Sequence, residues 1–321
     1  MKIIKSINKL HNDVNFKANI GFVPTMGSLH KGHVSLIESA KKKCDIVLVS
    51  IFVNPSQFNS MKDYKNYPKN ISNDIKILKK LKVNYLFIPK TKEIYKNKKD
   101  MKIQISSKDK ILCAKFRKGH FEGVLGVMDQ LLKLIKAKYL FLGEKDYQQV
   151  YLIKNFIKNR YKIKIILGKT IRFKKSLAYS SRNKLLNKKQ IEIACSIAKK
   201  LMKFRLSINN NITISKNLST LKNEILKYKI KLDYLEIRNK TDKLIEISFV
   251  QKLYYDGNCI TCNNANNSYK LKLDAHNYVL GSCSEATNFD FLRLKGCYRN
   301  GNQFEYLSGY RIKLLDSKIL N

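Results

Sequence analysis

The sequence has no long apolar run and no disulfide pattern, and each absence excludes a class of protein. No stretch reaches the roughly 18 consecutive apolar residues that a transmembrane helix needs, so no membrane association is expected. The N-terminus, MKIIKSINKLHNDVNFK, lacks the continuous apolar core of a signal peptide. The seven cysteines are odd in number and scattered, which indicates reduced thiols and a cytoplasmic protein.

Arginine is also scarce, although the chain is strongly basic. Lys and Arg number 64 against 24 Asp and Glu, a formal net charge of +40, but only nine of the basic residues are Arg. Proteins that read nucleic acid favour Arg, because its planar guanidinium binds phosphate and guanine with two hydrogen bonds. The lysines are spread along the chain among many asparagines. We therefore interpret the charge as compositional drift and expect no nucleic-acid partner; a polyanion-binding protein is the alternative.

Apolar periodicity predicts the fold of the first part of the chain. Short apolar runs at 20–25, 45–53, 84–89, 139–143 and 163–167 read as buried strands. Helical segments lie between them, the clearest after Gly119, where apolar residues recur at three- and four-residue spacing. This alternation predicts an α/β fold, a Rossmann-like doubly wound parallel sheet, over residues 1–175. Such sheets bind ligands at the carboxyl ends of their strands.

The pattern changes after about residue 183. Two helical segments, 187–204 and 215–229, precede short strand candidates, which predicts a second, smaller α+β domain over residues 176–277. Residues 278–321 form an unassigned C-terminal extension. Cys259 and Cys262, with Cys283 and Cys297, raise a zinc site as an alternative, but one C-x-x-C pair in a predicted strand favours buried thiols.

Four segments could carry chemistry. In FVPTMGSLHKGH (22–33), a strand ends at Pro and Gly, and a helix follows near His30. A helix start directs free backbone N–H groups and the positive end of the helix dipole at a ligand, and His30 and His33 lie one turn apart. The other three are SIFVNPSQF (50–58), GEKDYQQ (143–149) and SSRN (180–183). Amides, a cation, a carboxylate and hydroxyls at strand ends suit phosphate and Mg²⁺.

Together these segments resemble the pantothenate synthetase family. The resemblance extends to YPKNISND (67–74), GHFEGV (119–124) and LDYLEIRN (232–239), in the family's order. It departs at Tyr179, where Met or Leu is usual, and at Cys113, where an acid is usual. The family joins pantoate and β-alanine with ATP in two steps, forming pantoyl adenylate and pyrophosphate, then pantothenate and AMP. The resemblance therefore implies a cytoplasmic, homodimeric ligase that uses ATP and Mg²⁺.

The resemblance also implies roles for individual residues. Gln57 and Gln149 would bind pantoate, with Gln57 also near β-alanine, and Asp146 would lie near Mg²⁺. His30, His33, Lys145 and Arg182 would be the catalytic residues that offset charge on the phosphates. The implied ATP-binding residues are Met26, Gly27, Ser28, Leu29, His30, Lys31, Gly32, His33, Gly143, Glu144, Lys145, Asp146, Ile171, Tyr179, Ser180, Ser181 and Arg182.

The nearest alternative is another HxGH nucleotidyltransferase, which would transfer a nucleotide to a different acceptor without making an amide. A phosphate-bearing acceptor calls for cations, whereas Gln57 and Gln149 are amides. The two amides therefore argue against a nucleotidyltransferase that acts on a phosphate acceptor.

Overall fold

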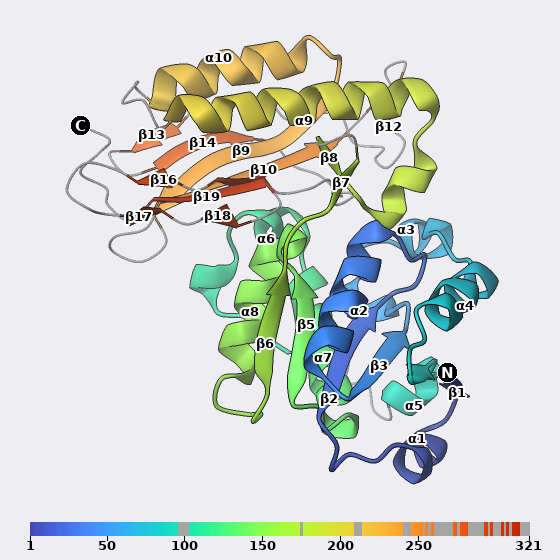
Figure 1. Cartoon of the computed structure of the whole chain (residues 1–321). Helices are drawn as coiled ribbons and strands as arrows, with labels where there is room; N and C mark the ends of the chain where they lie inside the picture. Colours follow the sequence, from blue (N-terminus) through green and yellow to red (C-terminus); the bar gives the residue numbers. More distant parts are fainter. Residues whose placement is uncertain are drawn as a thin grey trace. The chain divides into compact units, whose positions relative to one another are not determined.

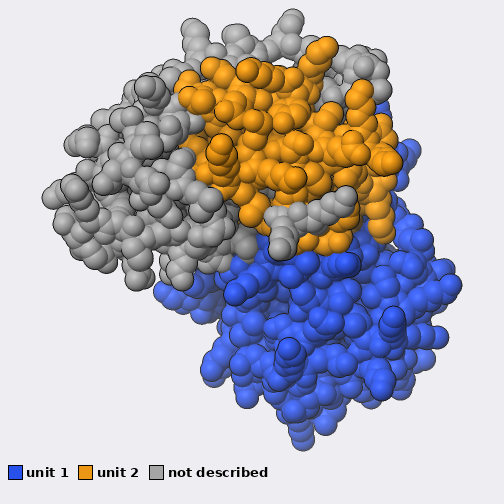
Figure 2. Space-filling view, turned by 45° about the horizontal axis from the view of Figure 1, so that its top comes forward, with its two compact units in different colours: residues 1–144, 148–171 blue, residues 145–147, 172–321 orange. Residues whose placement is uncertain are grey.

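The computed structural model describes residues 1–95, 103–173, 176–208 and 214–239, and the short strands of the later chain given below. Two compact units form (Figure 2). Unit 1 comprises Met1–Glu144 and Gln148–Ile171, and unit 2 comprises Lys145–Tyr147 and Arg172–Asn321.

Unit 1 is built on a six-stranded sheet in the order β1-β4-β3-β2-β5-β6, in which every pairing is parallel (Figure 1). The strands are β1 (Lys2–Ile4), β2 (Ile20–Thr25), β3 (Ile46–Ile51), β4 (Tyr85–Phe87), β5 (Tyr139–Gly143) and β6 (Lys164–Gly168). The predicted parallel α/β sheet is confirmed. The edge strand β6 is only partly buried, and β1 has no counterpart among the expected strands.

Helices connect these strands. They are α1 (Ile7–Asp13), α2 (Lys31–Lys43), α3 (Met61–Asn66), α4 (Ile71–Lys80), α5 (Thr91–Ile94), α6 (Cys113–Phe116), α7 (His120–Leu134) and α8 (Tyr147–Ile157), with the short 3₁₀ turns η1 (Pro55–Gln57), η3 (Ser107–Asp109) and η4 (Glu144–Asp146). The helices expected near His30 and after Gly119 are α2 and α7.

Both faces of the unit 1 sheet are buried. Val23, Val49 and Phe141 belong to a core cluster that includes the apolar face of α2. Their chain neighbours Phe22 and Leu48 are also fully buried, and successive strand residues point to opposite faces. A second apolar layer therefore covers the other face, as expected for a sheet with helices on both sides (Figure 1).

The strand order places a switch point beside β2. The chain passes from β2 to β3 on one side, and returns later to β5 on the other side. Doubly wound sheets bind ligands outside the carboxyl ends of the strands at such a point. The residues directly after β2 and β5, from Met26 and from Glu144, are therefore where the topology predicts a site.

Unit 2 starts with a hairpin, continues with helices and ends in an antiparallel-rich sheet. Its elements are β7 (Arg172–Phe173), β8 (Leu177–Ala178), η5 (Ser181–Leu185), α9 (Lys188–Ile208), α10 (Ile214–Leu226), β9 (Lys231–Asn239), β10 (Ile245–Lys252), β11 (Tyr254–Tyr255), β12 (Asn258–Cys259), β13 (Lys272–Asp274), β14 (Asn277–Gly281), β15 (Leu292–Leu294), β16 (Gly296–Cys297), β17 (Gln303–Phe304), β18 (Tyr306–Leu307) and β19 (Tyr310–Leu314). α9 and α10 lie side by side and are joined by an ion pair between Lys200 and Glu224 (2.6 Å) (Figure 1).

Strands from the C-terminal extension flank β9 and β10. β14 pairs with β9, and β19 pairs with β10, both antiparallel. In the described parts of the chain, no helix is long and apolar enough to cross a membrane, and no group of three or more His, Cys, Asp or Glu could hold a metal. Cys262 and Cys283 of the alternative zinc site lie outside the described residues.

Candidate active site at the strand ends

The turn after β2 is held in an unusual backbone conformation. Gly27 and Ser28 have φ values of 78° and 51°. Glycine adopts positive φ readily, but serine rarely does, so the surroundings must stabilise the turn. Ser28 is fully buried, and a side chain from another helix supplies the stabilising contacts.

That side chain is Asp74, on α4. Its carboxylate accepts hydrogen bonds from the backbone N–H groups of Ser28 (2.8 Å) and Leu29 (2.7 Å). Asp74 is only 1% exposed, so the two amide donors largely replace water around its charge. Asp74 belongs to the YPKNISND segment, but the sequence assigns it no role.

His30 and His33 cap the helix that follows. His30 is the N-cap of α2, and its Nδ1 accepts from the Gly32 N–H (3.1 Å), while Nδ1 of His33 accepts from the His30 N–H (3.4 Å). The two rings stack with centroids 4.0 Å apart. Both side chains are half-buried.

This arrangement differs from the expectation of free backbone N–H groups. The N–H of Gly27 donates to the Thr25 hydroxyl (3.1 Å), and those of Ser28, Leu29, His30 and Gly32 donate to Asp74 and to the two imidazoles. A ring nitrogen that accepts a hydrogen bond carries no proton, so each neutral imidazole has its proton on Nε2. The ring donors of His30 and His33 are therefore their Nε2–H groups.

The charges of α2 suit an anionic ligand. Its first turn contains no acidic residue, and its last turn contains Lys41, Lys42 and Lys43. The lysines complement the negative end of the helix dipole, whereas the positive end has no acidic side chain of the helix beside it.

The end of β3 carries a network of side-chain amides. Asn54, 1% exposed, donates from Nδ2 to Oε1 of Gln57 (3.1 Å) and to the carbonyl oxygen of Gly123 in α7 (3.0 Å). Gln57 in turn contacts Met26 Sδ with its Nε2 (2.9 Å), which brings the ends of β2 and β3 together. A side chain at Gly123 would overlap the Ser56 carbonyl, so only glycine fits where α7 meets η1.

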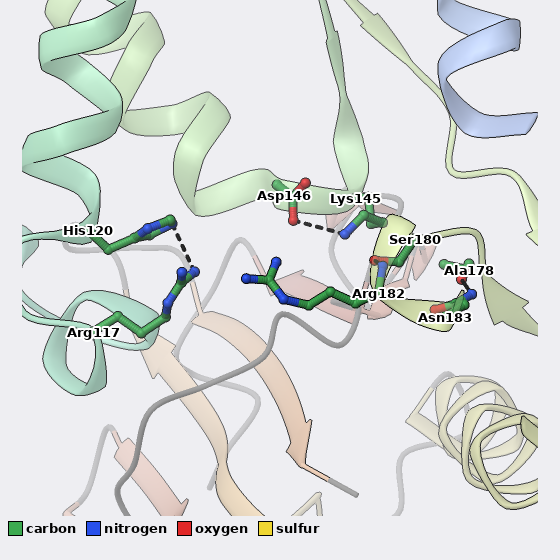
Figure 3. A network of polar contacts seen from close by, with 8 residues as sticks. All are labelled: Arg117, His120, Lys145, Asp146, Ala178, Ser180, Arg182 and Asn183. Atoms are coloured by element: carbon green, nitrogen blue, oxygen red, sulfur yellow. Dashed lines mark hydrogen bonds and ion pairs between the residues drawn. The ribbon is translucent and has the colours of Figure 1, made fainter. Parts of the chain in front are cut away.

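A buried pair of side chains, His120 and Arg117, stabilises the backbone at Gln57. His120 Nδ1 lies 2.6 Å from the Gln57 carbonyl oxygen, and its Nε2 lies 2.9 Å from Nη1 of Arg117 (Figure 3). A carbonyl only accepts and a guanidinium only donates, so His120 is neutral with its proton on Nδ1. Arg117 and His120 are 2% and 4% exposed.

At the start of α8, two adjacent glutamines have different environments. Gln148 is 5% exposed; its Oε1 accepts from the Cys113 N–H (3.1 Å), and its Nε2 donates to the Ile111 carbonyl (2.7 Å). Gln149, the expected pantoate ligand, is half-buried. Gln148 thus holds the chain before α6, whereas Gln149 has the more exposed side chain of the two. Glu144 is buried, and Ile171 is half-buried at the end of unit 1.

Lys31 and Gly143 belong to unit 1, and the other expected residues, Lys145, Asp146 and Tyr179 to Arg182, belong to unit 2. Lys145 and Asp146 form an ion pair (3.1 Å) with side chains 16% and 32% exposed (Figure 3). Ser180 caps η5 by accepting from the Arg182 N–H (3.3 Å), and Arg182 is 5% exposed. Tyr179 packs edge-on against Phe173 of the hairpin, with ring centroids 6.2 Å apart.

Comparison with known proteins shows which family the chain belongs to. The model of the pantoate-beta-alanine ligase family matches residues 2–260. The chain belongs to this family. It is therefore a ligase of pantothenate biosynthesis, as the sequence resemblance predicted.

Individual relatives agree with this family membership. The chain is 44% identical to the pantothenate synthetase of Francisella tularensis subsp. novicida over 241 residues, which is 74% of this chain and 88% of the relative. A pantoate-beta-alanine ligase structure from Francisella tularensis, solved with beta-gamma ATP and beta-alanine, has a TM-score of 0.68 at 42% identity and covers 78% of this chain and 93% of its own. A pantothenate synthetase from Thermus thermophilus has a TM-score of 0.71 at 27% identity, covering 78% and 95%.

Proposed function

We propose that the protein condenses pantoate with β-alanine through a pantoyl-adenylate intermediate. Support comes from the family membership and from the His30–His33 donors and the Gln57 amide, which follow adjacent strands of one sheet and are linked through Met26. A site of amides and N–H donors suits a reaction in which a substrate carboxylate is the nucleophile.

The proposed reaction has two steps, formation of the adenylate and formation of the amide. A pantoate carboxylate oxygen attacks the α-phosphorus of ATP, and the bond to the bridging oxygen breaks as pyrophosphate leaves. The β-alanine amine then attacks the carbonyl carbon of the adenylate, the carbon–oxygen bond to phosphate breaks, AMP leaves, and the amine proton passes to solvent. No protein nucleophile takes part.

The contribution of the residues is alignment and neutralisation of charge. His30 and His33 would donate from Nε2 to phosphate oxygens, and Gln57 and Gln149 would hold pantoate. By the family resemblance, Lys145 and Arg182 would offset negative charge on the leaving pyrophosphate, and Met26 to His33, Gly143 to Asp146, Ile171 and Tyr179 to Arg182 would bind ATP.

The residues fit a Mg²⁺ ion that arrives with ATP. Asp146 offers one partly exposed carboxylate, and no larger group of ligands occurs among the described residues. Mg²⁺ at nucleotide sites is commonly held by one or two carboxylates, substrate phosphates and water. When bound, the ion would supply positive charge to the phosphates. A homodimer and a cytoplasmic location are proposed on the family resemblance and on the cysteine pattern.

The deciding experiment supplies the substrates in order. Purified protein with ATP, Mg²⁺ and pantoate alone should release pyrophosphate in a pantoate-dependent burst, and later addition of β-alanine should yield AMP and pantothenate. Pyrophosphate release that ignores pantoate, or no reaction by the folded protein, would overturn the proposal.

A further inference from the structure

The amide of Gln57 has its orientation imposed by a chain of hydrogen bonds that begins at Tyr95. Tyr95 is the residue after α5, lies 41 positions from Asn54 in the sequence and is 8% exposed. Its hydroxyl donates to Oδ1 of Asn54 (2.8 Å) and lies 3.1 Å from the Ser56 hydroxyl. The sequence gives Tyr95 no functional signal.

The orientation of Asn54 follows from partners that have only one role. The Ser56 N–H can only donate, and it donates to Oδ1 (3.2 Å). The Gly123 carbonyl can only accept, and it accepts from Nδ2 (3.0 Å). Exchanging the oxygen and nitrogen of Asn54 would oppose both partners, so the amide is fixed.

Tyr95 strengthens this arrangement as a permanent donor. Burial raises its pKa to about 12, so the hydroxyl keeps its proton at neutral pH. Oδ1 of Asn54 then receives hydrogen bonds from Tyr95, from the Ser56 hydroxyl (2.9 Å) and from the Ser56 N–H. An oxygen that receives three donors holds the Asn54 side chain in one rotamer.

The orientation of Gln57 follows from that of Asn54. One N–H of Asn54 goes to Gly123, and the other goes to Oε1 of Gln57. Oε1 of Gln57 therefore faces Asn54, and its Nε2 is at the Met26 side. The Nε2 amide group of Gln57 can donate to a ligand, which suits a carboxylate or hydroxyl oxygen.

We propose that Tyr95 is a positioning residue for the hydroxy-acid substrate: by holding Asn54 in one rotamer, it keeps Gln57 in place to donate a hydrogen bond to an oxygen of pantoate. This inference rests on the proposed function and adds a residue that supports the pantoate role of Gln57.

The test is Tyr95→Phe, with Tyr161→Phe as the matched control. Tyr161 also lies in unit 1, and its hydroxyl also donates to a side-chain oxygen, Oδ1 of Asp129 (2.7 Å). Each variant loses one hydroxyl hydrogen bond, so both should unfold at a slightly lower temperature. Only Tyr95→Phe should raise KM for pantoate, by about three- to tenfold, the equivalent of one hydrogen bond, with KM for ATP unchanged.

Two further measurements test whether Tyr95 acts through Asn54 and Gln57. Ser56→Ala removes the second hydroxyl on Asn54 and should raise the pantoate KM in the same direction by a smaller factor. In ¹⁵N NMR spectra, the side-chain amide signals of Asn54 and Gln57 should shift in Tyr95→Phe and stay unchanged in Tyr161→Phe; this readout needs no activity.

Different results would refute the proposed function and the role of Tyr95. Wild-type protein that shows no pantoate-dependent pyrophosphate release refutes the proposed function. Active wild type with an unchanged pantoate KM in folded Tyr95→Phe refutes the role of Tyr95, as does an equal rise of that KM in Tyr161→Phe.

Discussion

Two helices of unit 1 begin with histidines that use opposite ends of the imidazole ring. At the start of α2, His30 and His33 accept backbone N–H groups at Nδ1 and carry their protons on Nε2. At the start of α7, His120 donates from Nδ1 to a carbonyl and accepts at Nε2 from Arg117. The first pair is half-buried and the third is 4% exposed. The hydrogen-bond partners of a histidine thus distinguish one that can donate to a ligand from one that stabilises a loop. The residue type alone does not distinguish them.

The largest expected effect comes from removing a ligand-facing histidine. His33→Ala should lower kcat/KM by roughly 10²–10³-fold, equivalent to about 2–4 kcal/mol for one preorganised donor. Its free energy of unfolding should change much less. Steady-state kinetics with urea unfolding would measure both, and exposed His11→Ala is the control. A near-normal rate in His33→Ala would remove the distinction between the two kinds of histidine.

A smaller effect is expected from the residue that shapes the turn before His30. Asp74→Asn keeps one acceptor but turns an NH₂ toward a backbone N–H, which leaves a buried donor unpaired at about 1–3 kcal/mol. KM for ATP should therefore rise by about tenfold, beyond any loss of stability. Asp129→Asn is the matched control, since Asp129 is also buried and accepts from Tyr161 and Lys133. An equal change of KM in both variants would show that Asp74 acts through stability alone.

The last prediction concerns the position of the ring proton in each histidine and needs no measurement of activity. Long-range ¹⁵N–¹H spectra of the imidazoles at neutral pH should show the Nε2–H form for His30 and His33 and the Nδ1–H form for His120. The His33→Ala variant assigns one signal. The same form in all three residues would contradict the contrast between the helix starts.

The sequence predicts the elements of unit 1 well because they depend on local patterns. The apolar runs at 20–25 and 139–143 and the periodic face after Gly119 appear as β2, β5 and α7. Strand β1 is only three residues long, too short to show a period, and its existence depends on pairing with β4.

The parts of the site that the sequence misses depend on contacts between distant residues. Asp74 meets Ser28 across 46 positions, and Asn54 meets Gly123 across 69. Sequence motifs describe residues that are close together in the chain, so neither contact could be predicted from a motif. The expectation of free N–H groups near His30 was wrong for the same reason, since a helix start predicts N–H donors but not the side chains that occupy them.

The charges along α2 have a consequence for the lifetime of the protein. The helix carries three lysines at its C-terminal end and no acidic residue in its own first turn, so its dipole favours an anion that binds at its N-terminal end. Binding to the folded state alone adds RT ln(1 + [L]/Kd), about 2.7 kcal/mol at a ligand concentration of 100 Kd. A cell rich in nucleotide would then hold more of this chain folded and out of reach of proteases, and starvation would shorten its lifetime.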